Sequence, residues 1–248
     1  MDLGLDGRVY IITGGSRGLG YATAQALVAD GARVVLSSRH PEKAAEALGP
    51  PAIGVAADLT DPDTPDRLIR AATGHFGRLD GALISVGGPA PGSAAAMTDE
   101  QWRSAFETVF LGSVRAVRVI ASALSAGGAI GVVLSTTVKT PLTGLGLSNG
   151  LRPGLAMAAK DMADEYGPRG IRIVGLLPGR VMTDRNRELF AAGGDPAAAA
   201  AEAAGTIPLR RIGEPEEFGK VAAFLLSPAA GYVTGAAIPV DGGYLRAL

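Results

Sequence analysis

A glycine-rich stretch near the start of the chain, TGGSRGLG, has the residue types and spacing to bind an anion. The apolar run Val9–Ile12 before it predicts a buried strand, and the pattern YATAQALVAD after it predicts a helix. Gly14, Gly18 and Gly20 lack side chains, so backbone N–H groups can approach an anion, and the positive helix end points to the same place. The stretch indicates a dinucleotide pyrophosphate site, with a plain strand-to-helix turn as the alternative.

Basic residues flank the place where the adenosine end of such a dinucleotide would bind. The second apolar run ends in Ser38 and Arg39, where an acidic residue would select NAD by binding the ribose hydroxyls. Arg39 can instead bind a 2′-phosphate through two N–H groups, and Arg17 in the glycine stretch can assist. This predicts NADP(H) as the preferred cofactor, with NAD(H) possible. The alternative is that Arg39 is a solvated charge and Arg17 caps local structure.

The elements that must position these residues alternate along the whole chain. Strand-like apolar runs are followed by helical patterns, which predicts an α/β fold: one Rossmann-type domain, residues 1–248, with a doubly wound parallel sheet of about seven strands and helices on both faces. Ligands of such sheets bind beyond the carboxyl ends of the strands. The expected strands are 9–12, 32–38, 52–58, 79–85, 129–135, 171–177 and 236–240, and the main helices are 42–48, 62–75, 99–124, 149–166, 184–204 and 215–226.

Composition excludes several classes of function. The 248 residues are 47% hydrophobic with a net charge of −1, which argues against nucleic acid or an anionic membrane as a partner. No cysteine and only two histidines are present, so a thiolate or histidine metal site and a Ser-His-Asp triad are not expected. With no signal pattern and no long apolar span, we expect a cytoplasmic protein. The Ala-rich part of 184–204 is either a lid over the site or a surface helix.

Several segments together resemble the short-chain dehydrogenase/reductase family. TGGSRGLG resembles its T-G-x-x-x-G-x-G loop, AADLTD its adenine-contacting segment, and LLPGRVMT its P-G-x-V-x-T segment. IPLRRIGEPEEFG and IPVDGG resemble the last third of members like 3-oxoacyl-[acyl-carrier-protein] reductase. The resemblance implies hydride transfer between a nicotinamide and a small carbonyl or alcohol, of which a 3-oxoacyl-like compound is one candidate, in a homotetramer or dimer.

The same resemblance implies a set of cofactor-binding residues. Asp58 would accept from the adenine amino group, although capping the next turn is an alternative role for it. The implied set is Gly14, Ser16, Arg17, Gly18, Leu19, Gly20, Ser38, Arg39, Asp58, Leu59, Val86, Gly87, Arg152, Pro178, Gly179, Val181 and Thr183.

The catalytic pattern of the family, Asn, Ser and Y-x-x-x-K, is where this sequence departs. Aligned on EYGPRGIRI, the Ser position falls on Ser135, or on Thr136 if the loop is one residue shorter. The Tyr and Lys positions fall on Ser148 and Arg152, and the Asn position falls near Phe110. Pro153 is expected in the first turn of the helix that carries Arg152, because proline is tolerated there.

These departures remove the acid that the family uses. A serine hydroxyl is too weak an acid, and arginine stays protonated, although Arg152 can bind ribose and stabilise an alkoxide by its charge. Lys139 is a candidate replacement acid if it is desolvated in the site, and a surface lysine if it is not. The loop 89–97 carries no charge, which suggests an uncharged, apolar substrate portion.

Three functions remain open at this stage. The first is an NADPH-dependent enzyme with a non-standard centre of Ser135, Ser148 and Arg152, with Lys139 as a possible fourth member. The second is a catalytically impaired member that binds NADP(H) as a sensor or structural ligand. The third is an interaction protein that has lost the cofactor, which the intact glycine stretch, Asp58 and Thr183 argue against.

Overall fold

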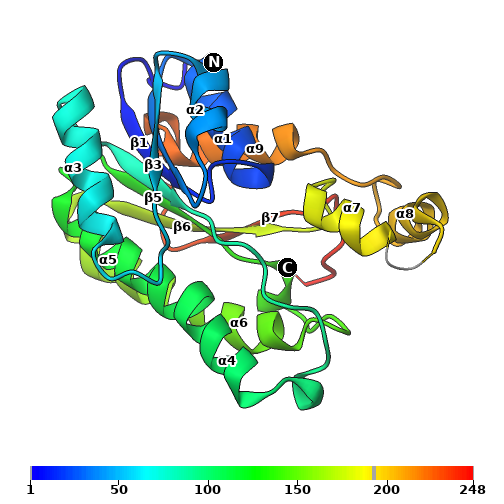
Figure 1. Cartoon of the computed structure of the whole chain (residues 1–248). Coiled ribbons are helices and arrows are strands. Elements are labelled where there is room, and N and C mark those ends of the chain that lie inside the picture. Colours follow the sequence, from blue (N-terminus) through cyan, green and yellow to red (C-terminus); the bar gives the residue numbers. More distant parts are fainter. Residues whose placement is uncertain (1, 192–193, 248) are drawn as a thin grey trace.

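A parallel β-sheet runs through the centre of the molecule (Figure 1). In the computed structural model, which describes residues 2–191 and 194–247, it has seven strands in the order β3-β2-β1-β4-β5-β6-β7. The predicted doubly wound α/β fold is therefore confirmed. The strands are β1 (Val9–Thr13), β2 (Arg33–Ser38), β3 (Ala52–Ala56), β4 (Gly81–Ile84), β5 (Ala129–Val133), β6 (Arg172–Pro178) and β7 (Ala237–Val240).

Helices cover both faces of the sheet because the strand side chains alternate between two apolar cores. In β1, Ile11 belongs to the core under α3, α5 and α6, whereas Tyr10 and Ile12 belong to the core under α1, α2 and α9. Both layers are visible in Figure 1. The bounds are α1 (Gly18–Ala29), α2 (Glu42–Leu48), α3 (Thr64–Phe76), α5 (Gly112–Ala123), α6 (Gly146–Tyr166) and α9 (Pro215–Leu226), with short turns η1 (Ala94–Ala96), η3 (Thr136–Val138), η4 (Gly167–Arg169) and η5 (Pro228–Ala230).

The long helix expected over 99–124 is continuous but not uniform. It begins as α4 (Asp99–Ala105), capped by Thr98, widens into the π-helical segment η2 (Phe106–Leu111) and continues as α5. The π segment lies where α6 approaches closely: a Cβ added to Gly154 would be 3.2 Å from the ring of Phe110.

Helix α6 begins at Gly146, three residues earlier than expected. Pro153 is therefore inside the helix and not in its first turn, so that expectation is wrong. The early start is possible because Gly146 packs directly on the backbone of Ala94, where a side chain would not fit. Ser148 consequently lies in the first turn, and Arg152 lies one turn further on.

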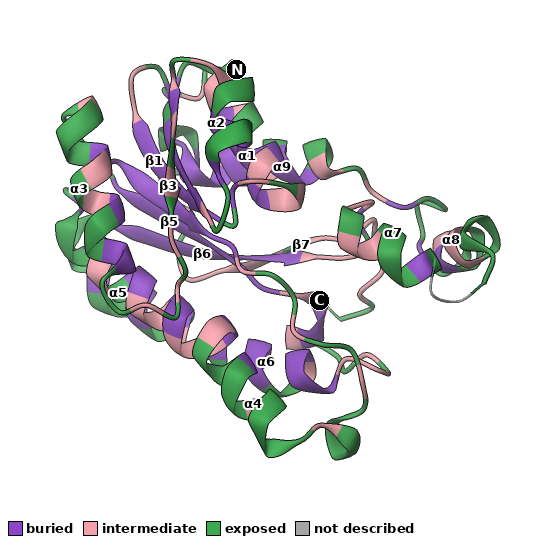
Figure 2. Cartoon of the chain, viewed as in Figure 1, coloured by how far each residue is buried: buried purple, intermediate pink, exposed green. Residues whose placement is uncertain are grey.

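The Ala-rich segment lies beyond the carboxyl edge of the sheet and forms two helices, α7 (Asp184–Ala191) and α8 (Pro196–Gly205). Residues 192 and 193 of the predicted helical stretch lie outside the described residues. Asp195 caps α8 by accepting from the N–H groups of residues 197 and 198. Figure 2 shows that α8 is largely exposed. Separately, no described helix is long and apolar enough to cross a membrane.

Candidate active site

The turn between β1 and α1 is a cradle that excludes side chains. Gly14 has φ +58°, and a Cβ there would lie 2.7 Å from the carbonyl oxygen of Ser85. A Cβ on Gly20 would lie 2.5 Å from the carbonyl oxygen of Gly14. Arg17 occupies the N-cap of α1 without a side-chain capping hydrogen bond, so the first N–H groups of α1 are open to an anion. The cradle fits a dinucleotide pyrophosphate.

The end of β1 is hydrogen-bonded to the end of β4, and the order of strands in the sheet reverses between these two strands. Thr13 Oγ1 donates to the carbonyl oxygen of Ser85 at 2.8 Å and accepts from the Ser85 N–H at 2.8 Å. This crevice is where ligands bind in doubly wound sheets. Val86 and Gly87 follow directly and extend past the crevice.

The adenosine end of the crevice carries exposed positive charge. Arg17 and Arg39 are both exposed, and neither forms an ion pair within residues 2–191 and 194–247. Ser38 accepts from the N–H of His40 at 3.2 Å. A 2′-phosphate could therefore approach either guanidinium, although the carboxylate of Asp58 is close enough for its charge to interact with that of Arg39.

Asp58 acts here as a turn cap, which was the alternative role suggested by the sequence. Its Oδ1 accepts from the N–H of Thr60 at 2.9 Å and from Thr60 Oγ1 at 2.8 Å. These hydrogen bonds lower the pKa of Asp58, and the charge of Arg39 lowers it further. Asp58 thus stays ionised while it fixes the turn that includes Leu59.

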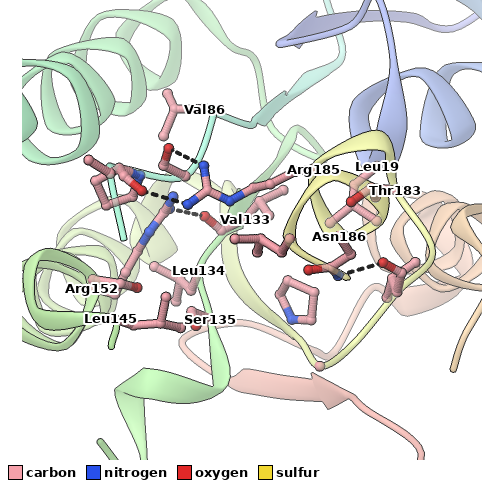
Figure 3. A pocket seen from close by; sticks show the side chains of 18 residues that line it. Leu19, Val86, Val133, Leu134, Ser135, Leu145, Arg152, Thr183, Arg185 and Asn186 are labelled. Carbon is pink, nitrogen blue, oxygen red and sulfur yellow. Dashed lines mark hydrogen bonds between the residues drawn. The ribbon is translucent and has the colours of Figure 1, made fainter. Parts of the chain in front are cut away.

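A cavity of about 200 Å³ continues from the glycine cradle between the ends of β4, β5 and β6 and helices α6 and α7 (Figure 3). Gly18 joins the two regions, since a Cβ there would lie 3.5 Å from Thr183 Cγ2. The predicted residues that line the cavity are Leu19, Val86, Ser135, Ser148, Arg152, Pro178, Gly179, Val181 and Thr183. Most of the residues that the sequence linked to the nicotinamide end and to catalysis are therefore brought together.

Hydroxyl groups gather at one side of this cavity. Ser148 Oγ lies 3.1 Å from Thr137 Oγ1, and Ser135 Oγ accepts from the Thr137 N–H at 3.2 Å. Of the two candidates for the serine position, Ser135 lines the cavity, whereas Thr136 is buried outside its lining. Thr137 was missed by the sequence argument, although it belongs to the same short turn, η3.

Arg152 is a buried cation at the floor of the cavity. Its side chain is only 4% exposed, and its Nη1 donates to the carbonyl oxygen of Val133 at 2.5 Å. Burial, with a smaller contribution from the positive charge of Arg185, lowers the pKa of Arg152 to about 10. The guanidinium thus remains protonated at neutral pH, in surroundings where its charge is weakly screened.

Arg185 is the second cation of the cavity, and the sequence argument missed it. It lies in the first turn of α7 and donates from Nη1 to the Gly88 carbonyl at 2.6 Å and from Nη2 to the Pro89 carbonyl at 2.5 Å. A Cβ on Gly88 would be 2.7 Å from the guanidinium carbon, so the glycine makes room for Arg185. Nothing in the charged stretch 184–188 distinguishes Arg185 from its exposed neighbours.

Lys139 does not take part in this site. It is exposed at the end of η3 and is not among the residues that line the cavity, so the expectation of a desolvated lysine is wrong. Tyr166 lies at the far end of α6, where its hydroxyl donates to the Arg118 carbonyl at 3.4 Å. Among the described lining residues, the ionisable groups are the guanidinium groups of Arg152 and Arg185.

Comparison with known proteins agrees with this geometry. A family model described as enoyl-(acyl carrier protein) reductase matches residues 14–245. The chain belongs to this family, the short-chain dehydrogenases/reductases. An uncharacterized oxidoreductase of Methylorubrum extorquens is 32% identical over 246 residues, which are 96% of this chain and 98% of that protein. The chain is thus an oxidoreductase of the short-chain dehydrogenase/reductase type.

Two further members of the family have more specific names. The 3-oxoacyl-[acyl-carrier-protein] reductase of Vibrio cholerae is 28% identical over 97% of this chain and 98% of its own length. The crystal structure of L-sorbose reductase from Gluconobacter frateurii, in complex with NADPH and L-sorbose, is similar with a TM-score of 0.94 at 29% identity, covering 100% of both chains.

Proposed function

We propose that the protein is an NADP(H)-dependent oxidoreductase that interconverts a small carbonyl compound and its alcohol. The observation that carries this proposal is the continuity between the glycine cradle and the cavity that holds Arg152 and Ser148. A dinucleotide with its pyrophosphate in the cradle has a path for its nicotinamide into this cavity. The similar L-sorbose reductase binds NADPH, which supports the same cofactor here.

The residues present fit NADP(H) along its length. The first N–H groups of α1, around Gly18, would bind the pyrophosphate, and Thr183 lies beside them. Arg17 and Arg39 would bind the 2′-phosphate, which NAD(H) lacks. Arg152 would donate to the ribose next to the nicotinamide.

The reduction needs a hydride, a site for the carbonyl oxygen and a proton. NADPH, when bound, supplies the hydride to the carbonyl carbon. Ser148 and Ser135 donate hydrogen bonds to the carbonyl oxygen, and the charge of Arg152 stabilises the alkoxide as the C=O π bond breaks. Solvent water supplies the final proton to the alkoxide, because the described lining offers no side-chain acid that titrates near neutral pH.

A second candidate function follows from that same lack of an acid. Without a positioned general acid, turnover is expected to be about 10²- to 10⁴-fold slower than in a site that has one. The protein would then bind NADP(H) mainly as a sensor or structural ligand. Binding alone does not separate the two functions, so the test must measure reduction.

A rapid-mixing experiment makes this distinction. Protein in excess over NADPH is mixed with a carbonyl panel that includes L-sorbose and a 3-oxoacyl thioester, and NADPH absorbance is followed through one turnover. If the protein is an enzyme, at least one carbonyl compound should oxidise NADPH. Arg152→Leu should slow this oxidation about 10²-fold or more, whereas Arg187→Leu, on the exposed face of α7, should leave its rate unchanged. If the protein binds NADPH tightly but no carbonyl compound changes the NADPH absorbance, the result would favour the sensor or structural function.

A further inference from the structure

The second guanidinium of the cavity has no counterpart in the chemistry proposed so far. Arg185 reaches from α7 across to the loop after β4, and its two terminal nitrogens hold the carbonyls of Gly88 and Pro89. Figure 3 shows the Arg185 and Arg152 side chains directed into the same space. The two carbonyls engage only part of the guanidinium, so its other N–H groups remain for a ligand.

The charge balance of this space favours an anion. Arg152 and Arg185 both line the cavity, and no aspartate or glutamate is among its described lining residues. Neither arginine forms an ion pair in the part of the chain that the structure describes. Two neighbouring cations repel each other, and one of them is buried, so a bound anion would lower the energy of both.

The lining of the cavity places the two cations beside the candidate reaction site. It includes Leu19 and Thr183 on the cradle side, where the nicotinamide would enter. The same lining holds Arg152 and Arg185 together with Ser135 and Ser148, whose hydroxyls would bind the carbonyl oxygen. A substrate that reaches both the hydroxyls and the cations carries a carbonyl and an anion in the same molecule.

We propose that Arg185 binds a carboxylate of the substrate, with the nearby charge of Arg152 adding to the positive potential there, so that the natural substrate is an oxo acid or the corresponding hydroxy acid. This inference rests on the proposed oxidoreductase function and names its substrate class. Guanidinium groups bind carboxylates through paired N–H donors, which also fixes orientation. The uncharged, apolar substrate portion expected from loop 89–97 stays a prediction for the part of the substrate away from Arg185, which binds the Gly88 and Pro89 carbonyls at the start of that loop.

Calorimetric titration of the NADP⁺-loaded protein tests the inference without turnover. Pyruvate and acetoacetate are compared with their methyl esters, which have the same carbonyl but no charge. Wild-type protein is expected to bind each acid at least about tenfold more tightly than its ester. Arg185→Leu should abolish this preference, and Arg185→Lys should keep part of it.

A matched control separates a local effect from a general change of charge. Arg187→Leu removes a cation from the same helix, where it pairs with Asp184 at 3.1 Å outside the cavity, and should keep the full preference. The NADP⁺ Kd should change less than about threefold in Arg185→Leu, as expected if Arg185 binds the substrate and not the cofactor.

Two results would overturn the inference: equal binding of acid and ester by the wild type, or a preference that survives in Arg185→Leu. Either result would mean that Arg185 has only a structural role, connecting α7 to the loop after β4. If the wild type binds no NADP⁺, the proposed function fails instead. The acid and ester pairs are then compared on the cofactor-free protein by shifts in Tm, which still decide for or against the anion site.

Discussion

Arg152 combines a full positive charge with almost complete burial. Such a cation is costly to fold around, because one hydrogen bond to the Val133 carbonyl replaces only part of its hydration. A residue with a purely structural role would be better served by an apolar side chain of the same length. The cost makes sense if the charge acts on a ligand, at the ribose and at the developing alkoxide.

Arg152→Met is expected to separate stability from function. Removing the unpaired charge should leave the free energy of unfolding unchanged or raise it by up to about 2 kcal/mol, despite the lost bond to Val133. The rate of NADPH oxidation should fall about 10²- to 10³-fold. Denaturant unfolding and single-turnover absorbance measure the two effects. Clear destabilisation with retained activity would contradict the assigned role.

The pH dependence follows from the pKa of the same residue. In the proposed mechanism the protonated form of Arg152 is the active one, and burial lowers its pKa to about 10. kcat/KM for NADPH oxidation should therefore be flat between about pH 6 and 9 and fall as pH rises through about 10. A rate that instead changes with an apparent pKa near 7 would reveal an acid or base outside the described lining of the cavity.

At the scale of elements, the β1–α1 turn and helix α7 define the two ends of the site. Gly14 and Gly20 of the turn pack closely on backbone atoms, whereas the side chain of Arg185 joins α7 to the loop after β4 through two hydrogen bonds. In the proposed function, the turn therefore sets where the cofactor would bind, and α7 lines the side of the cavity proposed for the substrate.

Gly20→Ala tests the cradle. The new Cβ would lie 2.5 Å from the Gly14 carbonyl oxygen, so the turn must open. We expect a loss of about 1–3 kcal/mol in unfolding free energy and at least about tenfold weaker NADPH binding. Gly74→Ala in α3, with no atom within 4 Å of the new Cβ, is the control. Gly74→Ala should raise the free energy of unfolding by about 0.5–1 kcal/mol and leave the NADPH Kd unchanged.

Local patterns were sufficient for most elements, whereas the cofactor-binding residues stay a prediction. Helices α2 and α9 match the expected bounds, because the residues that cause each helix to begin and to end lie directly beside that helix in the sequence. The early start of α6 and the partners of Arg185 depend on distant contacts: Gly146 packs on Ala94, and Arg185 bonds to Gly88, 97 residues away. Such contacts leave no periodic signal, so one sequence does not reveal them.

At the scale of the whole molecule, two helical layers enclose a sheet whose carboxyl edge carries the site. The layer with α6 also carries exposed apolar side chains: Met157 on α6 is 71% exposed, and Phe106 on the adjoining segment η2 is 42% exposed. We propose that this layer pairs with that of a second copy, giving the dimer or tetramer that the family resemblance implies.

Met157→Glu should weaken that pairing, because a charge would be buried between the two copies. Light scattering of the wild type is expected to give a dimer or tetramer, and the variant should give a smaller species. Gln25→Glu, on the exposed face of α1 across the sheet, adds the same charge and should leave the mass unchanged. A monomeric wild type would contradict the proposed pairing.

Titration of the protein with NADPH and with NADH, followed by fluorescence, tests the account most directly. It predicts micromolar NADPH binding and at least about tenfold weaker NADH binding, with the difference lost in Arg39→Ala and kept in Arg33→Ala, at the opposite end of β2. Tighter NADH binding would contradict the roles of Arg17 and Arg39. Binding of neither would contradict the oxidoreductase site itself and leave a Rossmann-type interaction protein.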